Sequence, residues 1–157
     1  MPVIPCPAAA LGIRRGPSVS GATGEHAVTI AVISASSIPC SVTGYPTVAF
    51  LDSAGHLMPF SYVLGTGQYI SHQPPSPVTL GGGREALFTV AKYRCDEHVT
   101  DTATGMNVLL PGQGTTYSAP TSWLTSRMDQ CSGPVTPDPG NTVEISAFEP
   151  AGDIPAH

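Results

Sequence analysis

Residues 27–34 have the sequence Ala27-Val28-Thr29-Ile30-Ala31-Val32-Ile33-Ser34. Within this run, large β-branched side chains at positions 28, 30 and 32 alternate with smaller ones. A period of two is typical of a β-strand that buries one face, because successive side chains point to opposite sides. Residues 86–93 (Ala-Leu-Phe-Thr-Val-Ala-Lys-Tyr) form a second apolar run of similar length. Both runs predict long strands within a sheet.

Shorter apolar segments, separated by turn residues, extend this pattern in both directions. We expect further strands at residues 47–51, 56–60, 78–80, 107–110 and 142–148. The sequence Asp52-Ser53-Ala54-Gly55 predicts a hairpin turn between 47–51 and 56–60. No segment shows a helical period, and short strands at this spacing favour a sandwich. The sequence therefore predicts an all-β fold: an Ig-like antiparallel β-sandwich of about eight short strands with two disulfides.

The length of 157 residues predicts one domain, spanning residues 1–157. Residues 1–26 form a loop-rich N-terminal segment in this prediction, within which residues 8–13 form either a single turn or an edge strand. Residues 150–157 are expected to be a frayed tail.

Charged residues make up only 11% of the chain, against roughly 25% in an average domain. The formal net charge is −5, which argues against nucleic acid as a partner because phosphate binding needs a basic patch. No apolar run approaches the ~18 residues of a membrane-spanning helix. We therefore expect no transmembrane segment.

The four cysteines are Cys6, Cys40, Cys95 and Cys131, each far from the next. Zinc sites use closely paired cysteines, so wide spacing and an even count favour two structural disulfides. Of three connectivities we favour Cys6–Cys40 with Cys95–Cys131, since each would pin a proline-rich segment to a neighbouring strand. The main alternative is an inter-sheet Cys40–Cys95 bridge, which expects a tryptophan between the two cysteines; the one tryptophan is Trp123.

Disulfides indicate an oxidising compartment, so we expect a secreted or cell-envelope protein outside the cytoplasmic membrane. Residues 1–5 lack the basic and apolar regions of a signal peptide. A mature chain with its signal peptide removed explains this best. A lipidated Cys6 is an alternative, although Ile4-Pro5 are not the small residues that would precede such a site.

The densest titratable cluster is Asp96-Glu97-His98 with Asp101. It would serve a secreted hydrolase or a metal-handling protein, but neighbouring loop residues rarely converge on one ligand, and a solvated loop is the favoured interpretation. The histidines have no metal-binding spacing, and no G-x-S-x-G motif precedes a helix. We expect no catalytic residue, no cofactor and no metal. The histidines are His26, His56, His72, His98 and His157.

Four tyrosines lie in or beside predicted loops: Tyr45, Tyr62, Tyr69 and Tyr117. Exposed tyrosines on a sandwich stack on sugars or anchor a protein partner, and equally they cover the core. They are the candidate binding surface.

The order of these features resembles the DUF4232 family, an actinobacterial, including mycobacterial, secreted and lipoprotein domain of unknown function. The resemblance depends most on Pro39-Cys40-Ser41-Val42-Thr43-Gly44-Tyr45-Pro46, and it includes Cys6, the hairpin 48–55, residues 77–80, Cys95, Leu110-Pro111-Gly112 and Cys131. Two departures are the triple glycine 81–83 in place of a Pro-Gly turn and the proline-rich insert before Pro77. The resemblance implies a β-sandwich, export and residence at the cell envelope, and it implies no catalytic residues.

We expect an exported, non-enzymatic domain that binds a protein, a glycan or an envelope component. The alternative is a secreted hydrolase or metal-handling protein that uses the Asp96–Asp101 region.

Overall fold

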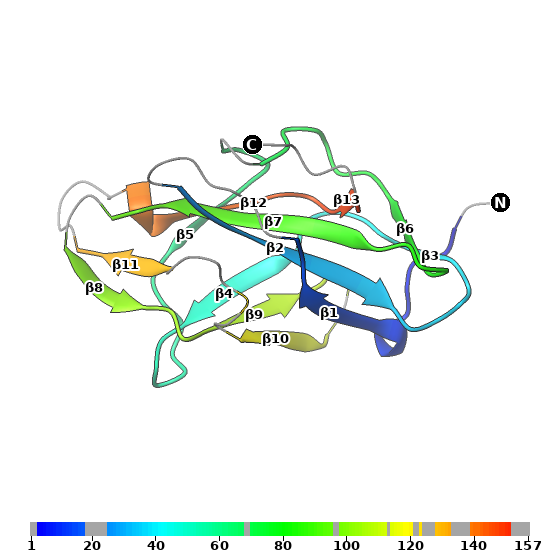
Figure 1. Ribbon diagram of the computed structural model, residues 1–157, viewed down its shortest axis with the longest axis horizontal. Coiled ribbons are helices and arrows are strands. Elements are labelled where there is room, and N and C mark those ends of the chain that lie inside the picture. Colours follow the sequence, from blue (N-terminus) through cyan, green and yellow to red (C-terminus); the bar gives the residue numbers. More distant parts are fainter. Residues whose placement is uncertain are drawn as a thin grey trace.

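The computed structural model describes residues 3–17, 25–67, 70–95, 98–112, 114–120, 123, 128–132 and 139–151. Within these residues the fold is all-β, with two 3-10 turns, η1 (Ala8–Ala10) and η3 (Pro139–Asn141) (Figure 1). The strands are β1 (Leu11–Arg15), β2 (Glu25–Ser34), β3 (Cys40–Val42), β4 (Thr47–Leu51), β5 (Ser61–Leu64), β6 (Val78–Leu80), β7 (Ala86–Tyr93), β8 (Val99–Thr102), β9 (Gly105–Leu109), β10 (Thr116–Pro120), β11 (Asp129–Cys131), β12 (Thr142–Ile145) and β13 (Glu149–Pro150).

The larger sheet has the strand order β1-β2-β7-β12-β5, and β13 pairs with β7 beyond β12. Strands β2 and β7 form its centre, antiparallel from the Glu25–Tyr93 pair to the Val32–Ala86 pair. Every residue of β7 except Tyr93 is buried, which explains why its sequence is almost continuously apolar. One pairing departs from the antiparallel prediction, because β5 runs parallel to β12.

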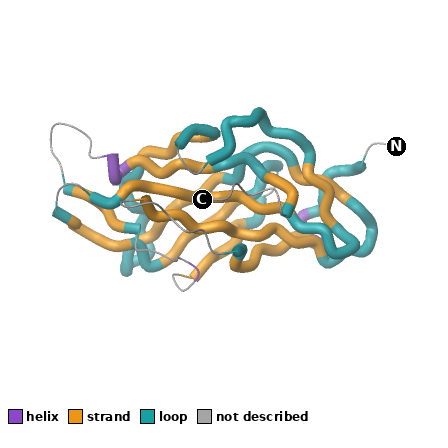
Figure 2. The backbone as a smooth tube through the Cα atoms, turned by 45° about the horizontal axis from the view of Figure 1, so that its top comes forward, coloured by secondary structure: helices purple, strands orange, loops and turns teal. Residues whose placement is uncertain are grey.

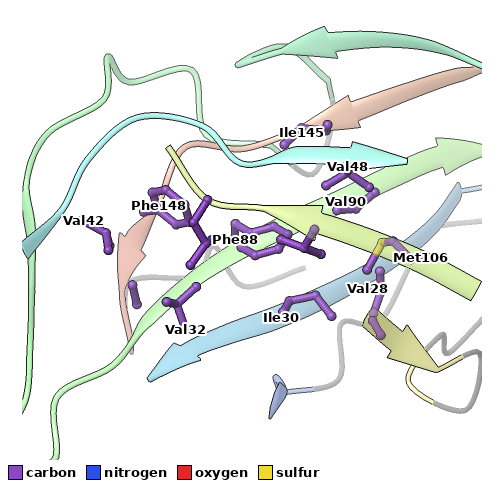
Figure 3. Close-up of a cluster of buried hydrophobic side chains, with 14 of the residues drawn as sticks. Val28, Ile30, Val32, Val42, Val48, Phe88, Val90, Met106, Ile145 and Phe148 are labelled. Carbon is purple, nitrogen blue, oxygen red and sulfur yellow. The ribbon is translucent and has the colours of Figure 1, made fainter. Parts of the chain in front are cut away.

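The second layer is the antiparallel sheet β10-β9-β4, which faces the larger sheet (Figures 1 and 2). Alternate residues of β4 and β9 are buried, as the period of two requires. The two layers enclose one principal core, in which Val28, Ile30 and Phe88 from the first sheet meet Val48 and Met106 from the second (Figure 3). Each such side chain contributes roughly 1.5–3 kcal/mol through its burial. The predicted sandwich is confirmed.

Two small two-stranded sheets, β3-β6 and β11-β8, extend the sandwich, and each contains one cysteine of a disulfide. Cys6 bonds to Cys40 on β3, and Cys95 bonds to Cys131 on β11. The favoured connectivity is therefore confirmed, and the Cys40–Cys95 alternative is wrong. Each disulfide joins a segment outside the main strands to a strand of a small sheet.

Several predicted elements differ in detail from the structure. The turn at 52–55 forms, and residues 56–58 hydrogen-bond to the edge of β4 opposite β9. The return strand is reduced to the bridge between Leu51 and Leu57, because the Phe50 N–H is taken by the Tyr62 hydroxyl. The predicted strand 142–148 is interrupted after Ile145, where the Ser146 side chain accepts a hydrogen bond from the N–H of Thr89 (2.8 Å). The strand number is thirteen among the described residues rather than about eight. The additional strands are short or lack a strong apolar pattern.

The N-terminal segment contains both η1 and β1, so residues 8–15 combine the turn and the edge strand that were predicted as alternatives. Of the predicted tail, residues 152–157 lie outside the described residues. No helix in the described part of the chain has the length and apolar character needed to cross a membrane.

Candidate functional site

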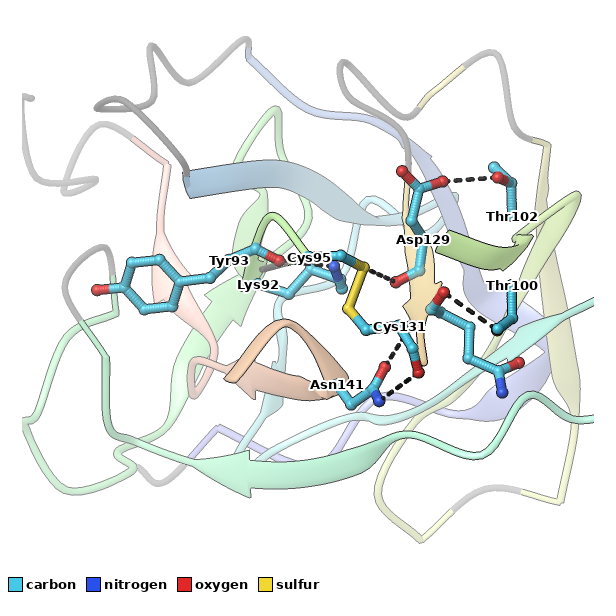
Figure 4. Close-up of a disulfide and its surroundings, with 9 residues drawn as sticks. Lys92, Tyr93, Cys95, Thr100, Thr102, Asp129, Cys131 and Asn141 are labelled. Carbon is cyan, nitrogen blue, oxygen red and sulfur yellow. Dashed lines mark hydrogen bonds between the residues drawn. A yellow bond between two sulfur atoms is a disulfide. The ribbon is translucent and has the colours of Figure 1, made fainter. Parts of the chain in front are cut away.

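The disulfide Cys95–Cys131 lies at the end of β7, beside β11 (Figure 4). The side chain of Asn141 fixes Cys131 on both sides, since its Oδ1 accepts from the Cys131 N–H (2.7 Å) and its Nδ2 donates to the Cys131 carbonyl (2.9 Å). Gly140 packs so closely here that an added Cβ would fall 2.6 Å from the Cys131 sulfur. This end of the molecule is therefore tightly packed around the disulfide.

Lys92 is fully buried next to this disulfide, and its Nζ donates to the carbonyl of Tyr93 (2.6 Å). His26 lies opposite Lys92 in the β2–β7 ladder. Burial lowers the pKa of His26, the charge of Lys92 lowers it further, and Asp129 opposes both effects. His26 is thus held toward its neutral form.

The predicted acidic cluster is described only in part, because Asp96 and Glu97 lie outside the described residues. His98 and Asp101 are exposed, and the Asp101 carboxylate accepts the N–H of Thr102 (2.8 Å). Across the described ranges, no group of three His, Cys, Asp or Glu side chains gathers as metal ligands would. The use of this region in catalysis or metal binding stays a prediction.

The other histidines lie apart from one another. His56 is exposed in the hairpin turn, with its Nδ1 3.9 Å from the Asp52 carboxylate. Backbone N–H groups of the turn, chiefly that of His56, lower the pKa of Asp52. The His72 ring nitrogen contacts the carbonyl of Gly67 at 2.9 Å, and His157 lies outside the described residues.

The tyrosines of the candidate binding surface occupy two different places. Tyr45 lies against Gly65, which follows β5. Tyr62 is on β5, and its hydroxyl accepts the N–H of Phe50 (3.2 Å). Burial raises the pKa of Tyr62. Tyr117 is on β10, and its hydroxyl approaches the carbonyls of Ala8 and Leu11.

All three are half-buried, and Tyr69 lies outside the described residues. Tyr62 and Tyr117 pack against the core. A joint binding role for the four tyrosines stays a prediction.

A groove of about 430 Å³, which we call the β6–β13 groove, lies between strands β6 and β13. The β6 wall is Pro77–Thr79, the opposite wall is Pro150–Ala151, and Gly83–Glu85 close one end. A second hollow of about 240 Å³ shares Pro150 with it and continues along the proline-rich loop 73–76 and residues 147–149. A third, of about 170 Å³, lies beside the Cys6–Cys40 disulfide.

The triple glycine shapes the closed end of the β6–β13 groove. Gly81, Gly82 and Gly83 have φ values of 97°, 62° and 86°, which other residues rarely adopt. The turn places Arg84 and Glu85 at the rim, where the carboxylate of Glu85 is paired with Arg14 from β1. The guanidinium Nε of Arg84 donates to the Gly81 carbonyl (3.1 Å).

Sequence reasoning missed this groove. Pro77 at the start of a short strand was the available signal, because proline is confined to strand starts and sheet edges. The opposing wall at Pro150 lies more than sixty residues further along the chain, so no local pattern indicates the juxtaposition.

No curated protein and no solved structure matches this chain. The family described as "Domain of unknown function (DUF4232)" matches residues 6–148, from the first disulfide cysteine to the buried Phe148. The match covers most of the chain and both disulfides, so the chain belongs to the DUF4232 family.

Proposed function

We propose that this chain is an exported, non-enzymatic domain that binds a protein, glycan or envelope component at the cell envelope or outside the cell. The β6–β13 groove is the single observation that carries the binding role. It is walled by backbone and proline rings on two strands, and the small sheet β3-β6 that forms one wall is tied to the N-terminal segment by the Cys6–Cys40 disulfide. A groove with rigid walls loses little conformational entropy on binding.

The two disulfides support an extracytoplasmic location. Both pairs of cysteines are oxidised, and disulfides of this kind persist in oxidising compartments. The actinobacterial origin and the secretion that the resemblance implies belong to the same proposal. Fractionation of the source cells, with thiol alkylation before lysis, tests it: oxidised protein in the envelope or medium is expected, and reduced protein in the cytoplasm would contradict it.

Affinity capture tests the binding role. The whole chain, with its disulfides intact, is immobilised and exposed to an envelope extract, alongside the charge-reversal variants Arg84→Glu and Arg94→Glu. Arg84 lies at the groove, whereas Arg94 is exposed at the opposite end of β7 and serves as the matched control. We expect one component to be retained by the wild type and by Arg94→Glu, and to be lost from Arg84→Glu.

The metal-handling alternative has a separate test. Metal analysis of protein purified without a histidine tag is expected to find no stoichiometric ion. A bound divalent ion in a 1:1 ratio would contradict this expectation and would favour a metal-handling role for the Asp96–Asp101 region.

A further inference from the structure

Strand β6 has one edge paired with β3, while its other edge faces the β6–β13 groove. The two strands are antiparallel, with Ser41 opposite Thr79. The N–H of Ser41 donates to the carbonyl of Ile4 (2.8 Å), and the carbonyl of Ser41 accepts from the N–H of Cys6 (2.9 Å). Both backbone groups of Ser41 therefore point away from β6.

This arrangement fixes the direction of the backbone groups of Thr79. In an antiparallel ladder, opposed residues alternate between pairs that exchange hydrogen bonds and pairs that do not. Because Ser41 uses both of its groups on the far side of β3, Ser41 and Thr79 form a pair without hydrogen bonds. The N–H and carbonyl of Thr79 consequently point outward, on the side where Thr79 lines the groove. Neither has a hydrogen-bond partner within the described part of the chain.

The opposite wall supplies a second acceptor. The N–H of Ala151 donates to the carbonyl of Glu85 (3.1 Å), so the backbone groups of Ala151 point toward the chain of β7. The backbone groups of the preceding residue, Pro150, therefore point away from β7. Proline has no N–H, and ladder geometry turns the Pro150 carbonyl away from β7. Thr79 thus presents one backbone donor and one acceptor, and Pro150 on the other wall has a carbonyl that β7 does not use.

At two other strand edges, the backbone groups are hydrogen-bonded within the protein itself. Two residues beyond Thr79, Gly81 exchanges both backbone hydrogen bonds with Arg84, at 3.3 and 3.2 Å. On β4, the N–H of Phe50 is taken by the Tyr62 hydroxyl. Proteins commonly protect exposed strand edges in this way, because open edges recruit other chains. The edge at Thr79 is left open, and it borders a groove.

The charges at the groove favour an acidic ligand group. The negative charge of Glu85 is compensated by its ion pair with Arg14, whereas Arg84 is exposed and forms no ion pair among the described residues. The rim therefore carries one uncompensated positive charge next to the open edge. If a ligand forms backbone hydrogen bonds with Thr79, a carboxylate close to the bonded ligand residue would form a charge-assisted hydrogen bond with the Arg84 guanidinium.

We propose that an extended peptide segment of a partner polypeptide binds in the β6–β13 groove by adding a strand to the edge of β6, with an acidic side chain or terminal carboxylate directed to Arg84. The peptide accepts from the N–H of Thr79 and donates to its carbonyl, as in other cases of strand addition. This proposal rests on the binding role proposed above and specifies its ligand and its site.

The test uses peptides selected from a random phage-displayed library on the wild-type chain. The most enriched peptide is synthesised, and its dissociation constant is measured by fluorescence anisotropy with the wild type, Thr79→Pro and Thr79→Val. Thr79→Pro removes the outward N–H without touching the β3 ladder, so the chain still folds; Thr79→Val keeps the N–H. We expect Thr79→Pro to weaken binding by about tenfold or more, which corresponds to about 1.4 kcal/mol, and Thr79→Val to bind like the wild type.

Amide exchange measured by NMR gives an independent readout. We expect the Thr79 amide to exchange rapidly in the free protein, since it is outside the ladder, and to become protected when the peptide binds. Replacing the acidic residue of the peptide, or Arg84→Glu in the protein, should weaken binding, whereas Arg94→Glu should not.

Several results would overturn the proposal: slow exchange of the free Thr79 amide, equal peptide binding to Thr79→Pro and wild type, equal peptide binding to Arg84→Glu and wild type, or no enriched peptide. If an envelope component is retained equally by the wild type and Thr79→Pro, the binding function stands and this site is wrong. If no component is retained and no peptide is enriched, both proposals fail.

Discussion

The hydroxyl of Tyr62, on β5, accepts a hydrogen bond from the backbone N–H of Phe50, on β4, at 3.2 Å. The contact joins the parallel edge strand of the larger sheet to the edge of the second sheet. It satisfies a donor that lies on the open side of β4, and it holds the two layers together at this edge.

Tyr62→Phe keeps the aromatic ring but leaves the Phe50 N–H without its acceptor. We expect the free energy of unfolding to fall by about 1–2 kcal/mol, the usual cost of a partly buried unsatisfied group. Urea unfolding measures the change. Tyr117→Phe is the control, because its hydroxyl contacts are long, at 3.4 and 3.5 Å, and its loss should cost less. An equal loss in both variants would contradict the importance of the Phe50 contact.

Reduction should proceed in a fixed order. Cys6 and Cys40 are both buried, with exposed fractions of 5% and 2%, whereas Cys95 is partly exposed. A thiolate must reach a sulfur atom to attack it, so we expect dithiothreitol to open Cys95–Cys131 first under native conditions. Timed alkylation followed by peptide mass spectrometry identifies the first free pair; alkylated Cys6 and Cys40 at early times would contradict this order.

Gly140→Ala should destabilise the fold strongly. The added Cβ would fall 2.6 Å from the Cys131 sulfur and 2.7 Å from the Arg94 carbonyl oxygen, and neither can easily move. Overpacking of this kind costs about 1–3 kcal/mol. Gly105→Ala is the matched control, since nothing lies within 4 Å of its Cβ, and thermal unfolding should distinguish the two. Equal melting temperatures would contradict the close approach.

His26 should make stability depend on pH. Its folded pKa is lowered below the ordinary 6.5, mainly by burial and then by Lys92. The unfolded chain therefore binds the proton more readily. The stability that neutral His26 contributes is present above pH about 6.5 and is lost as the pH falls through the folded pKa. Urea unfolding between pH 7 and pH 5, for the wild type and His26→Gln, measures the effect; we expect a smaller loss in the variant, and identical slopes would contradict it.

The strongest strands could be predicted because their own sequences specify them. Strand β2 alternates and β7 is continuously apolar, and both were located to within two residues. Strands β8 and β11 were missed, since their residues are mostly polar and they are held by pairing with each other beside a disulfide. The return strand at 56–60 is short for a different reason: its local turn is correct and residues 56–58 bond to the edge of β4 opposite β9, but the Tyr62 hydroxyl takes the next donor, the Phe50 N–H.

The disulfide pairing was predictable from spacing and from the lack of a tryptophan between Cys40 and Cys95. The β6–β13 groove was not, because the direction of the Thr79 backbone depends on what Ser41 does on the next strand. Pro150 joins the groove only through the pairing of β13 with β7. Such sites arise from ladder geometry, which residue types alone do not specify.

The parallel pairing of β5 with β12 determines when the molecule can be completed. Strand β12 lies between β7 and β5, and residues 61–64 meet residues 142–145, which lie about half the chain length further along the sequence. During synthesis, β5 has no neighbour in its own sheet until β12 has appeared. Closing so long a loop is entropically expensive and slow. A nascent chain therefore stays incompletely folded until residues 142–145 have been synthesised.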